Sequence, residues 1–242
     1  MEKDLSFLTS KFIAHCGLHN ETIPENSLPA FENAVKHGYA IELDVSPTLD
    51  GVAVTHYQTV IKTHKIVELT SLKESELANQ KIINTPHHIP SLSEVFSLVN
   101  GKTPIFIDIK QSKKKVGIFE ERLLNLIKNY KGQVAVMAFN PYVVKWFKEN
   151  APDIPRGLLT TIWRKNMLGC PNSALVRNLL SHNTLYKKGD ADFLSINIDD
   201  LPAKLPSKFD NLPILGWTVD SKQCYEEKKQ YVDNIIFENF LP

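Results

Sequence analysis

The sequence predicts a parallel α/β barrel, a (β/α)8 or TIM barrel, on three observations. Short β-rich runs alternate with longer helical stretches along all 242 residues, which is typical of parallel α/β folds rather than sandwiches or bundles. The β-rich runs number eight, the strand number that closes such a barrel. No linker rich in serine, glycine or proline divides the chain, so we expect one domain spanning residues 1–242.

The eight predicted strands are short apolar runs rich in isoleucine, valine, leucine and phenylalanine. They are Phe12–His15, Ala40–Val45, Ile105–Ile109, Val134–Met137, Arg156–Leu159, Phe193–Ile196, Ile214–Val219 and Asn234–Phe237. The predicted helices are Ser27–His37, Ser91–Leu98, Phe119–Asn129, Tyr142–Glu149, Asn172–Leu180 and Lys222–Tyr231. Asn26 is positioned to cap the first helix, and Pro29 falls in its first turn, where a backbone N–H is unpaired anyway.

Two segments depart from the repeat. Residues 57–103 form a small insertion between the second and third strands, after a short strand-like run at Val52–Thr55. An excursion of that length in a compact domain is more often functional than idle, although a decorative insertion is the alternative. Asp199–Pro213 is rich in proline and lysine and lacks helical periodicity, so we expect an irregular connection there.

Composition excludes several classes of protein. The 28 Lys and Arg residues nearly balance the 27 Asp and Glu residues, which argues against a general nucleic-acid binder. No apolar run approaches the roughly 20 residues that cross a bilayer, and the first residues are too charged for a secretory signal. We therefore expect a cytoplasmic protein. Cys16, Cys170 and Cys224 form no close pair, so neither a disulfide framework nor a zinc ribbon is predicted.

Two carboxylates share the inner face of the second predicted strand. Because side chains at i and i+2 point to one face of a strand, Glu42 and Asp44 are directed inward while Ile41, Leu43 and Val45 face the helices. The carboxyl ends of barrel strands are where catalytic groups gather. Two neighbouring carboxylates at that rim favour a divalent cation, which binds hard oxygen ligands.

Four further polar side chains lie at or just beyond the ends of the first strand, the third strand and the strand-like run. Asp108 offers a third carboxylate, and Lys110 supplies a fixed positive charge that suits a phosphate. His15 ends the first strand, and His56 follows the strand-like run. A single strand-end acid is more often solvated or capping, and a lone histidine is usually structural. The joint placement of these residues nevertheless favours a metal site.

Eight motifs resemble, in order and spacing, the glycerophosphodiester phosphodiesterase family of metal-dependent (β/α)8-barrel enzymes. They are I-A-H-C-G at Ile13–Gly17, P-E-N-S-L-P-A-F at Pro24–Phe31, I-E-L-D-V at Ile41–Val45, D-G-V-A-V-T-H at Asp50–His56, I-P-S-L-S-E-V at Ile89–Val95, I-F-I-D-I-K at Ile105–Lys110, G-W-T-V at Gly216–Val219 and D-N-I-I-F-E-N-F at Asp233–Phe240. The resemblance covers nearly the whole chain, and it implies that the insertion is the small inserted region of that family.

The resemblance implies hydrolysis of a small-molecule glycerophosphodiester to glycerol 3-phosphate and an alcohol. The site roles that it implies are His15 and His56 as the general acid/base pair, Glu42, Asp44 and Asp108 as ligands of Mg²⁺ or Ca²⁺, and Lys110 as a phosphate contact. It also makes Trp217 an aromatic wall against the glycerol, the alternative being a residue that packs at the barrel top.

Three positions depart from the family's pattern. Cys16 stands where the family has arginine, Tyr57 where it has aspartate, and Asp108 where it usually has glutamate. Losing one charged hydrogen bond to phosphate would cost on the order of 1.5–3 kcal/mol, or roughly ten- to two-hundred-fold in rate. One hypothesis is that the arginine and aspartate form an ion pair in the family and were lost together. The shorter Asp108 favours Ca²⁺, which accepts more flexible geometry than Mg²⁺.

Two other functions compete with hydrolysis. The first is a catalytically weakened or inactive barrel that binds a phosphorylated small molecule; the missing arginine favours it, and the retained histidines oppose it. The second is transfer or cyclisation of a phospholipid headgroup, which would need an apolar surface facing the membrane. No amphipathic stretch in the sequence is strong enough to supply that surface.

Overall fold

The computed structural model describes residues 3–55, 59–62, 65–110, 116–162, 190–202, 205 and 207–242. Its main sheet contains eight parallel strands, at the positions that the sequence predicts to within two residues at each end. These strands are β1 (Ile13–Ala14), β2 (Ala40–Pro47), β6 (Ile105–Ile109), β7 (Val134–Ala138), β8 (Arg156–Thr160), β9 (Phe193–Asn197), β10 (Ile214–Val219) and β11 (Asn234–Phe237).

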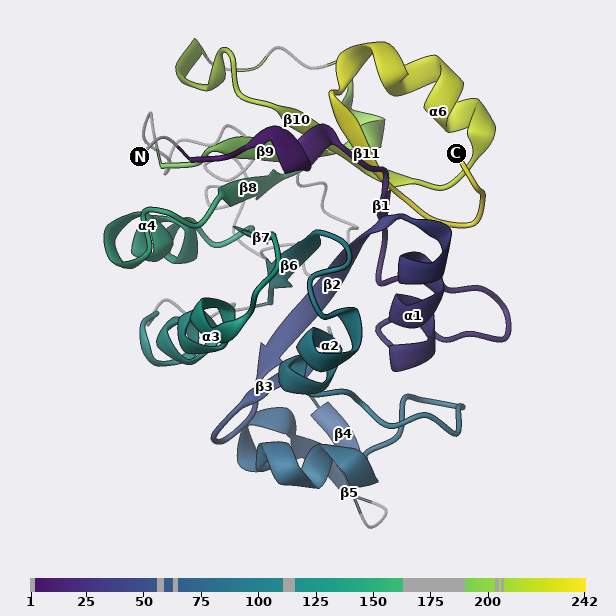
Figure 1. Cartoon of the computed structure of the whole chain (residues 1–242), viewed down its shortest axis with the longest axis vertical. Helices are drawn as coiled ribbons and strands as arrows, with labels where there is room; N and C mark the ends of the chain where they lie inside the picture. Colours follow the sequence, from purple (N-terminus) through teal and green to yellow (C-terminus); the bar gives the residue numbers. More distant parts are fainter. Residues whose placement is uncertain are drawn as a thin grey trace.

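The parallel strands close into a barrel. β1 pairs with β2 on one side and with β11 on the other, through Ile13 opposite Ala40 and Ile236. The order around the sheet otherwise follows the chain, from β2 through β6 to β11. The helices surround the strands (Figure 1). The prediction of a (β/α)8 barrel is therefore confirmed.

The insertion forms a separate layer beside β2. β3 (Val52–Val54) runs antiparallel to β2, and β4 (Thr59–Lys62) pairs with β5 (Lys65–Glu68) in a small second sheet. Two 3-10 helices, η2 (Leu69–Ser71) and η3 (Glu74–Asn79), follow. Their apolar side chains form a small core of their own, which includes Ala53, Val60, Leu69, Leu72, Leu77 and Ile89. Figure 1 shows this layer at the end of the molecule opposite β8 to β10.

The described helices are α1 (Leu28–His37), α2 (Leu92–Val99), α3 (Ile118–Asn129), α4 (Pro141–Asn150) and α6 (Lys222–Lys228), the last extended by η6 (Lys229–Tyr231). Ser91 caps α2 as part of a capping box with Glu94. The predicted cap of α1 is wrong: Ser27 Oγ accepts a hydrogen bond from Ala30 N, and Ser27 is the capping residue. Asn26 has a left-handed backbone instead (φ 51°), and its side chain serves the site described below.

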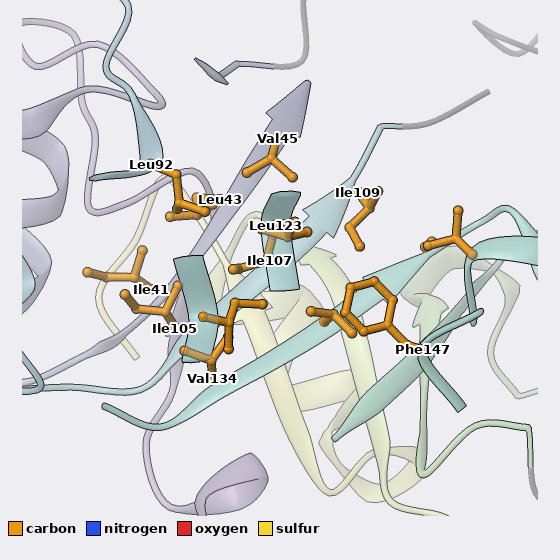
Figure 2. Close-up of a cluster of buried hydrophobic side chains, with 14 of the residues drawn as sticks. Ile41, Leu43, Val45, Leu92, Ile105, Ile107, Ile109, Leu123, Val134 and Phe147 are labelled. Atoms are coloured by element: carbon orange, nitrogen blue, oxygen red, sulfur yellow. The ribbon is translucent and has the colours of Figure 1, made fainter. Parts of the chain in front are cut away.

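Alternation along β2 separates two faces, as the sequence predicts. Ile41, Leu43 and Val45 point outward into the main core, where they meet side chains such as Leu92 and Leu123 of the surrounding helices (Figure 2). Glu42 and Asp44 point to the barrel interior. The alternation follows from the two-residue period of a strand, and it delivers both carboxylates to one side of the sheet.

The barrel interior is filled with apolar side chains at its amino-terminal end. Phe106 and Phe193 pack edge to face there, and Phe7 packs against Phe106. Phe7 belongs to η1 (Ser6–Thr9), which precedes β1. The amide of Asn234 in β11 holds this segment by donating to the carbonyls of Leu8 and Lys11, at 2.8 Å each. The chemistry is thereby left to the opposite, carboxyl-terminal rim.

The connection after β9 is irregular over its described residues, as predicted, with short 3-10 helices η4 (Ile198–Asp200) and η5 (Ser207–Phe209). The predicted helix Asn172–Leu180 lies outside the described residues. Among the helices that the structure describes, none is long and apolar enough to cross a membrane.

Candidate active site

Three carboxylates meet at the carboxyl-terminal rim of the barrel. β2 supplies Glu42 and Asp44, and Asp108 of β6 lies directly opposite Asp44 in the register. All three side chains are almost fully buried, and each places an oxygen within 4.8 Å of the others. One oxygen of Asp108, Oδ1, is buried without a hydrogen-bond partner in the described part of the chain. Such a cluster of hard oxygen donors fits Mg²⁺ or Ca²⁺.

Lys110 lies between two of these acids. It follows β6 directly, and its Nζ lies 2.8 Å from Asp44 Oδ1 and 2.5 Å from Asp108 Oδ2. Burial alone would lower the pKa of Lys110, but the charges of Asp108 and Asp44 outweigh it and hold the pKa well above its usual range. The ammonium group is therefore a permanent positive charge inside the site.

The carboxylates carry more negative charge than Lys110 neutralises. Burial, and next the charge of Asp44, raise the pKa of Glu42 to about 8. Burial also raises the pKa of Asp108 to about 6, although Lys110 opposes that rise. The charged forms of these acids are disfavoured without a further cation. A divalent ion between them would remove that cost.

His15 follows β1, where its backbone N–H donates to the carbonyl of Phe237 at 2.9 Å. Its Nδ1 lies 2.6 Å from Glu238 Oε2, while Nε2 faces the carboxylates, 4.0 Å from Glu42 Oε2. Burial lowers the pKa of His15, but the hydrogen bond to Glu238 and the charges of Glu42 and Asp44 prevail and raise it to about 9. Glu238 thus fixes the ring and leaves Nε2 directed at the carboxylates.

Cys16 binds Glu42 through its backbone N–H and places an uncharged thiol beside Asp44. Its N–H donates to Glu42 Oε2 at 2.9 Å, and its Sγ lies 3.6 Å from Asp44 Oδ2. Burial, followed by the charges of Asp44 and Glu42, raises the pKa of Cys16 well above its usual range. The Cys16 side chain therefore carries no charge in the site.

Sequence reasoning missed the role of Asn26. Its Nδ2 donates to Asp44 Oδ2 at 3.0 Å and to Cys16 Sγ at 3.2 Å, and its Oδ1 accepts from the backbone of Asp44 at 3.2 Å. The side chain is buried beside the acids. Asparagine adopts positive φ more readily than most residues, and Ser27 is an equally good helix cap, but neither property directs the Asn26 side chain to Asp44.

Glu238 and His19 were also missed. Glu238 follows β11 just as His15 follows β1. Because catalytic groups gather at the carboxyl ends of barrel strands, the position of Glu238 in the sequence already indicated it as a site residue. His19 lies in the loop after β1, and its Nε2 is 3.5 Å from Glu238 Oε2. No strand-end rule predicts His19, because its position depends on the turn at Gly17, whose carbonyl accepts from His19 N at 3.0 Å.

Trp217 of β10 lies on the inner face of the sheet, half buried. Its Nε1 donates to the carbonyl of Ser195 at 2.9 Å, and its ring meets Phe139 edge to face, with centroids 5.6 Å apart. These contacts hold the indole plane in one orientation. His56 and Tyr57, both singled out from the sequence, lie outside the described residues; the preceding Thr55 is buried, and its carbonyl accepts from Ser46 Oγ at 2.9 Å.

Two cavities adjoin residues that contact the carboxylates or His15. One, of about 730 Å³, lies between the insertion and the loop before α1; its lining includes Asn26, Thr55, Val60 and Ile89. The other, of about 670 Å³, lies on the side of β11, where its lining includes His19 and Glu238. The first cavity thus reaches Asn26, which donates to Asp44, and the second reaches Glu238, which binds His15.

The sequence of this chain matches the model of the family described as "Glycerophosphoryl diester phosphodiesterase family" over residues 15–240. One relative is YhdW of Bacillus subtilis (strain 168), which is named a "Putative glycerophosphodiester phosphodiesterase". It is 28% identical over 239 residues, which cover 93% of this chain and 92% of YhdW.

Solved structures of such enzymes share the barrel. A phosphodiesterase of Oleispira antarctica, in complex with the product sn-glycerol-3-phosphate, superposes with a TM-score of 0.69 at 19% identity, covering 96% of this chain and 93% of that one. A glycerophosphodiester phosphodiesterase of Parabacteroides distasonis gives a TM-score of 0.67 at 21% identity, covering 98% and 94%. At these identities the likeness concerns the fold.

Proposed function

The chain belongs to the glycerophosphoryl diester phosphodiesterase family of enzymes, and from that premise we propose that it hydrolyses a glycerophosphodiester to glycerol 3-phosphate and an alcohol. The observation that carries the proposal is the buried cluster of Glu42, Asp44 and Asp108 beside His15 and Lys110. The product bound to the Oleispira antarctica phosphodiesterase is the product expected here. We take residues 1–242 to act as one domain, with residues 57–103 as its insertion.

Glu42, Asp44 and Asp108 are the residues that would hold a divalent cation, Mg²⁺ or Ca²⁺. When bound, such an ion supplies a positive charge that neutralises a non-bridging oxygen of the phosphate. Asn26 keeps Asp44 in place through hydrogen bonds to both its carboxylate and its backbone N–H. The backbone of Cys16 does the same for Glu42. Both acids are therefore oriented before the substrate arrives.

His15 and His56 are the acid/base pair of this proposal. The hydrogen bond between His15 Nδ1 and Glu238 fixes the tautomer, so that Nε2 is the atom that takes up or releases a proton. One histidine accepts a proton from the attacking water, and the other donates one to the leaving alkoxide. Imidazole suits both steps near neutral pH.

Lys110 and Trp217 bind the two parts of the substrate. The Lys110 ammonium lies beside the carboxylates, where a phosphate that approaches the cation would meet it. Trp217, fixed by Ser195 and Phe139, forms an apolar wall for the glycerol carbons. Cys16 offers the phosphate no charge, so we expect turnover to be weaker than that of an enzyme with arginine there.

The experiment is a direct assay. The full chain is incubated with glycerophosphocholine or glycerophosphoethanolamine and with Mg²⁺, Ca²⁺ or Mn²⁺, and glycerol 3-phosphate is measured. We expect product that requires the ion and disappears in Asp44→Asn, a matched variant that excludes a contaminating enzyme. Absence of product under every condition would favour the alternative, a barrel that binds a phosphorylated small molecule without cleaving it.

A further inference from the structure

His15, His19 and Glu238 form a second cluster of metal-ligating side chains, on the side of the rim away from Asp108. His15 Nδ1 and His19 Nε2 lie 2.6 Å and 3.5 Å from the same atom, Glu238 Oε2. We propose that these three residues bind a transition-metal ion of the Zn²⁺ type, and that the bound ion stops catalysis by occupying His15. The binding is independent of the proposed reaction; only the inhibition rests on it.

The donor set selects for such an ion. Two imidazoles and one carboxylate are ligands that Zn²⁺ prefers, whereas Mg²⁺ and Ca²⁺ prefer oxygen alone. Glu42, Asp44 and Asp108 offer only oxygen. The two clusters, although adjacent, therefore suit different ions.

The distances fit with a small adjustment. Bonds of about 2.0–2.2 Å to zinc place ligand atoms roughly 3.3–3.5 Å apart in a tetrahedral site. His19 Nε2 and Glu238 Oε2 already have that separation. The shorter contact between His15 Nδ1 and Glu238 is a hydrogen bond, which opens when the metal replaces its proton. A water molecule can complete the four ligands.

His19 Nε2 lies 3.5 Å from Glu238 Oε2, beyond the usual length of a hydrogen bond. Its Nε2 is buried and makes no hydrogen bond of good geometry within the described residues, which is costly for a polar atom. The backbone around it is fixed, because Leu18 N donates to Ala30 O at 3.0 Å and Glu238 N donates to Val219 O at 3.0 Å. The ligands are therefore preorganised on two rigid segments.

The cluster is accessible. His19, Glu238 and Gly17 line the cavity of about 670 Å³ on the β11 side, which gives an ion a route from solvent and room for a water ligand. An ion bound to His15 Nδ1 leaves the proton on Nε2 and uses the only lone pair of the neutral ring. The ring can then neither accept a proton at Nε2 nor become imidazolium, so its acid/base cycle stops.

The test measures zinc binding and inhibition separately. The full chain is saturated with Ca²⁺, Zn²⁺ is titrated against a chromophoric zinc indicator, and turnover is followed in parallel relative to each protein's own zinc-free rate. We expect one zinc site, with at least tenfold weaker affinity in His19→Gln and in Glu238→Gln. His37→Gln is the matched control, since His37 is exposed in the lining of the same cavity; zinc affinity should not change.

Zinc binding at a neighbouring cluster is the alternative result that the experiment must distinguish. His15, Cys16 and Glu42 also bring their ligand atoms within 4.8 Å of one another. Binding there would be lost in Cys16→Ser and would give Co²⁺ a strong thiolate charge-transfer band, whereas the proposed site gives no such band. That result would overturn the proposal. The proposal would also be wrong if His19→Gln left the zinc affinity unchanged, or if the protein saturated with Ca²⁺ bound no zinc. Because binding is read without turnover, these failures are distinct from failure of the proposed hydrolysis.

Discussion

Buried charges gather at both ends of the barrel, and the two ends balance them differently. At the amino-terminal end, Arg156 begins β8; its Nη1 lies 3.2 Å from Asp192, and its Nε donates to the carbonyl of Asp190 at 2.7 Å. Lys3 reaches Asp192 at 2.7 Å, and Lys148 reaches Asp190 at 2.8 Å. Each carboxylate there therefore has at least one cation beside it.

At the carboxyl-terminal end the balance is reversed. Glu42, Asp44 and Asp108 share Lys110, with His15 at their edge. Removing one partner of a compensated buried pair destabilises the fold, whereas under-compensated buried charges are costly as they stand and are typical of functional sites. The comparison teaches that charge balance, rather than burial or the number of charged residues, separates the functional end of this barrel from the structural one.

The largest expected effect comes from removing a proton carrier at the functional end. His15→Ala should lower kcat by about 10²–10⁴, the usual range for loss of an acid/base group, while leaving the divalent cation bound. His56→Ala should do the same. Turnover and calcium affinity are measured for each variant. Near-normal kcat in either one would make that histidine structural.

The matching change at the structural end should alter stability instead. Arg156→Met removes one of the cations beside the Asp192 carboxylate and the donor to the Asp190 carbonyl, and losing a charged hydrogen bond costs about 1.5–3 kcal/mol. Urea denaturation measures the free energy of unfolding, and the folded variant should keep its kcat. The distinction between the two ends would be lost if Arg156→Met lowered kcat strongly and left the unfolding free energy unchanged.

The pH dependence of stability should reveal the excess negative charge at the carboxyl-terminal end. The pKa of Glu42 rises on folding from 4.5 to about 8, so the native metal-free protein holds a proton that the unfolded chain releases, and the unfolding free energy falls as pH rises through that range. The pKa of His15 rises from 6.5 to about 9, so its contribution is present below pH 6.5 and is lost through pH 9.

Both shifts therefore predict that Tm of the metal-free protein falls between about pH 5 and pH 9. We expect a decline of at least a few degrees, since 1 kcal/mol corresponds to about 2–4 °C in a chain of this size. Glu42→Gln should flatten the decline and abolish stabilisation by Ca²⁺, which depends on binding to the native state. Thermal melts across pH, with and without Ca²⁺, decide this; equal slopes in the variant and the parent would contradict it.

The smallest effect concerns the missing arginine. Cys16→Arg alone should change kcat/KM little, because the new side chain must displace the Asn26 amide from Cys16 and Asp44. Together with Tyr57→Asp, which supplies a partner, it should raise kcat/KM by roughly ten-fold or more, beyond the sum of the single effects. The measurement is a double-mutant cycle, and strict additivity would exclude the pairing.

Much of the fold follows from local patterns. β6, β10 and β11 have the predicted bounds, and Glu42 and Asp44 face inward as their spacing requires. The sequence also predicts which carboxylates meet, because parallel strands bring their carboxyl ends to one rim. It does not predict Asn26 or His19 at the site, because both depend on loop conformations set by contacts distant in the chain, such as that between Asn26 and Asp44.

The closure of β1 against β11 has a consequence for the growing polypeptide. β1 pairs with β11, and Asn234 donates to a carbonyl 226 residues earlier in the chain. Contacts of that sequence separation form slowly. While the ribosome is still adding β11, β1 has an unpaired edge and η1 lacks the Asn234 amide that holds it. The barrel therefore closes only after β11 has been made, and until then its open seam is exposed to aggregation or to chaperones.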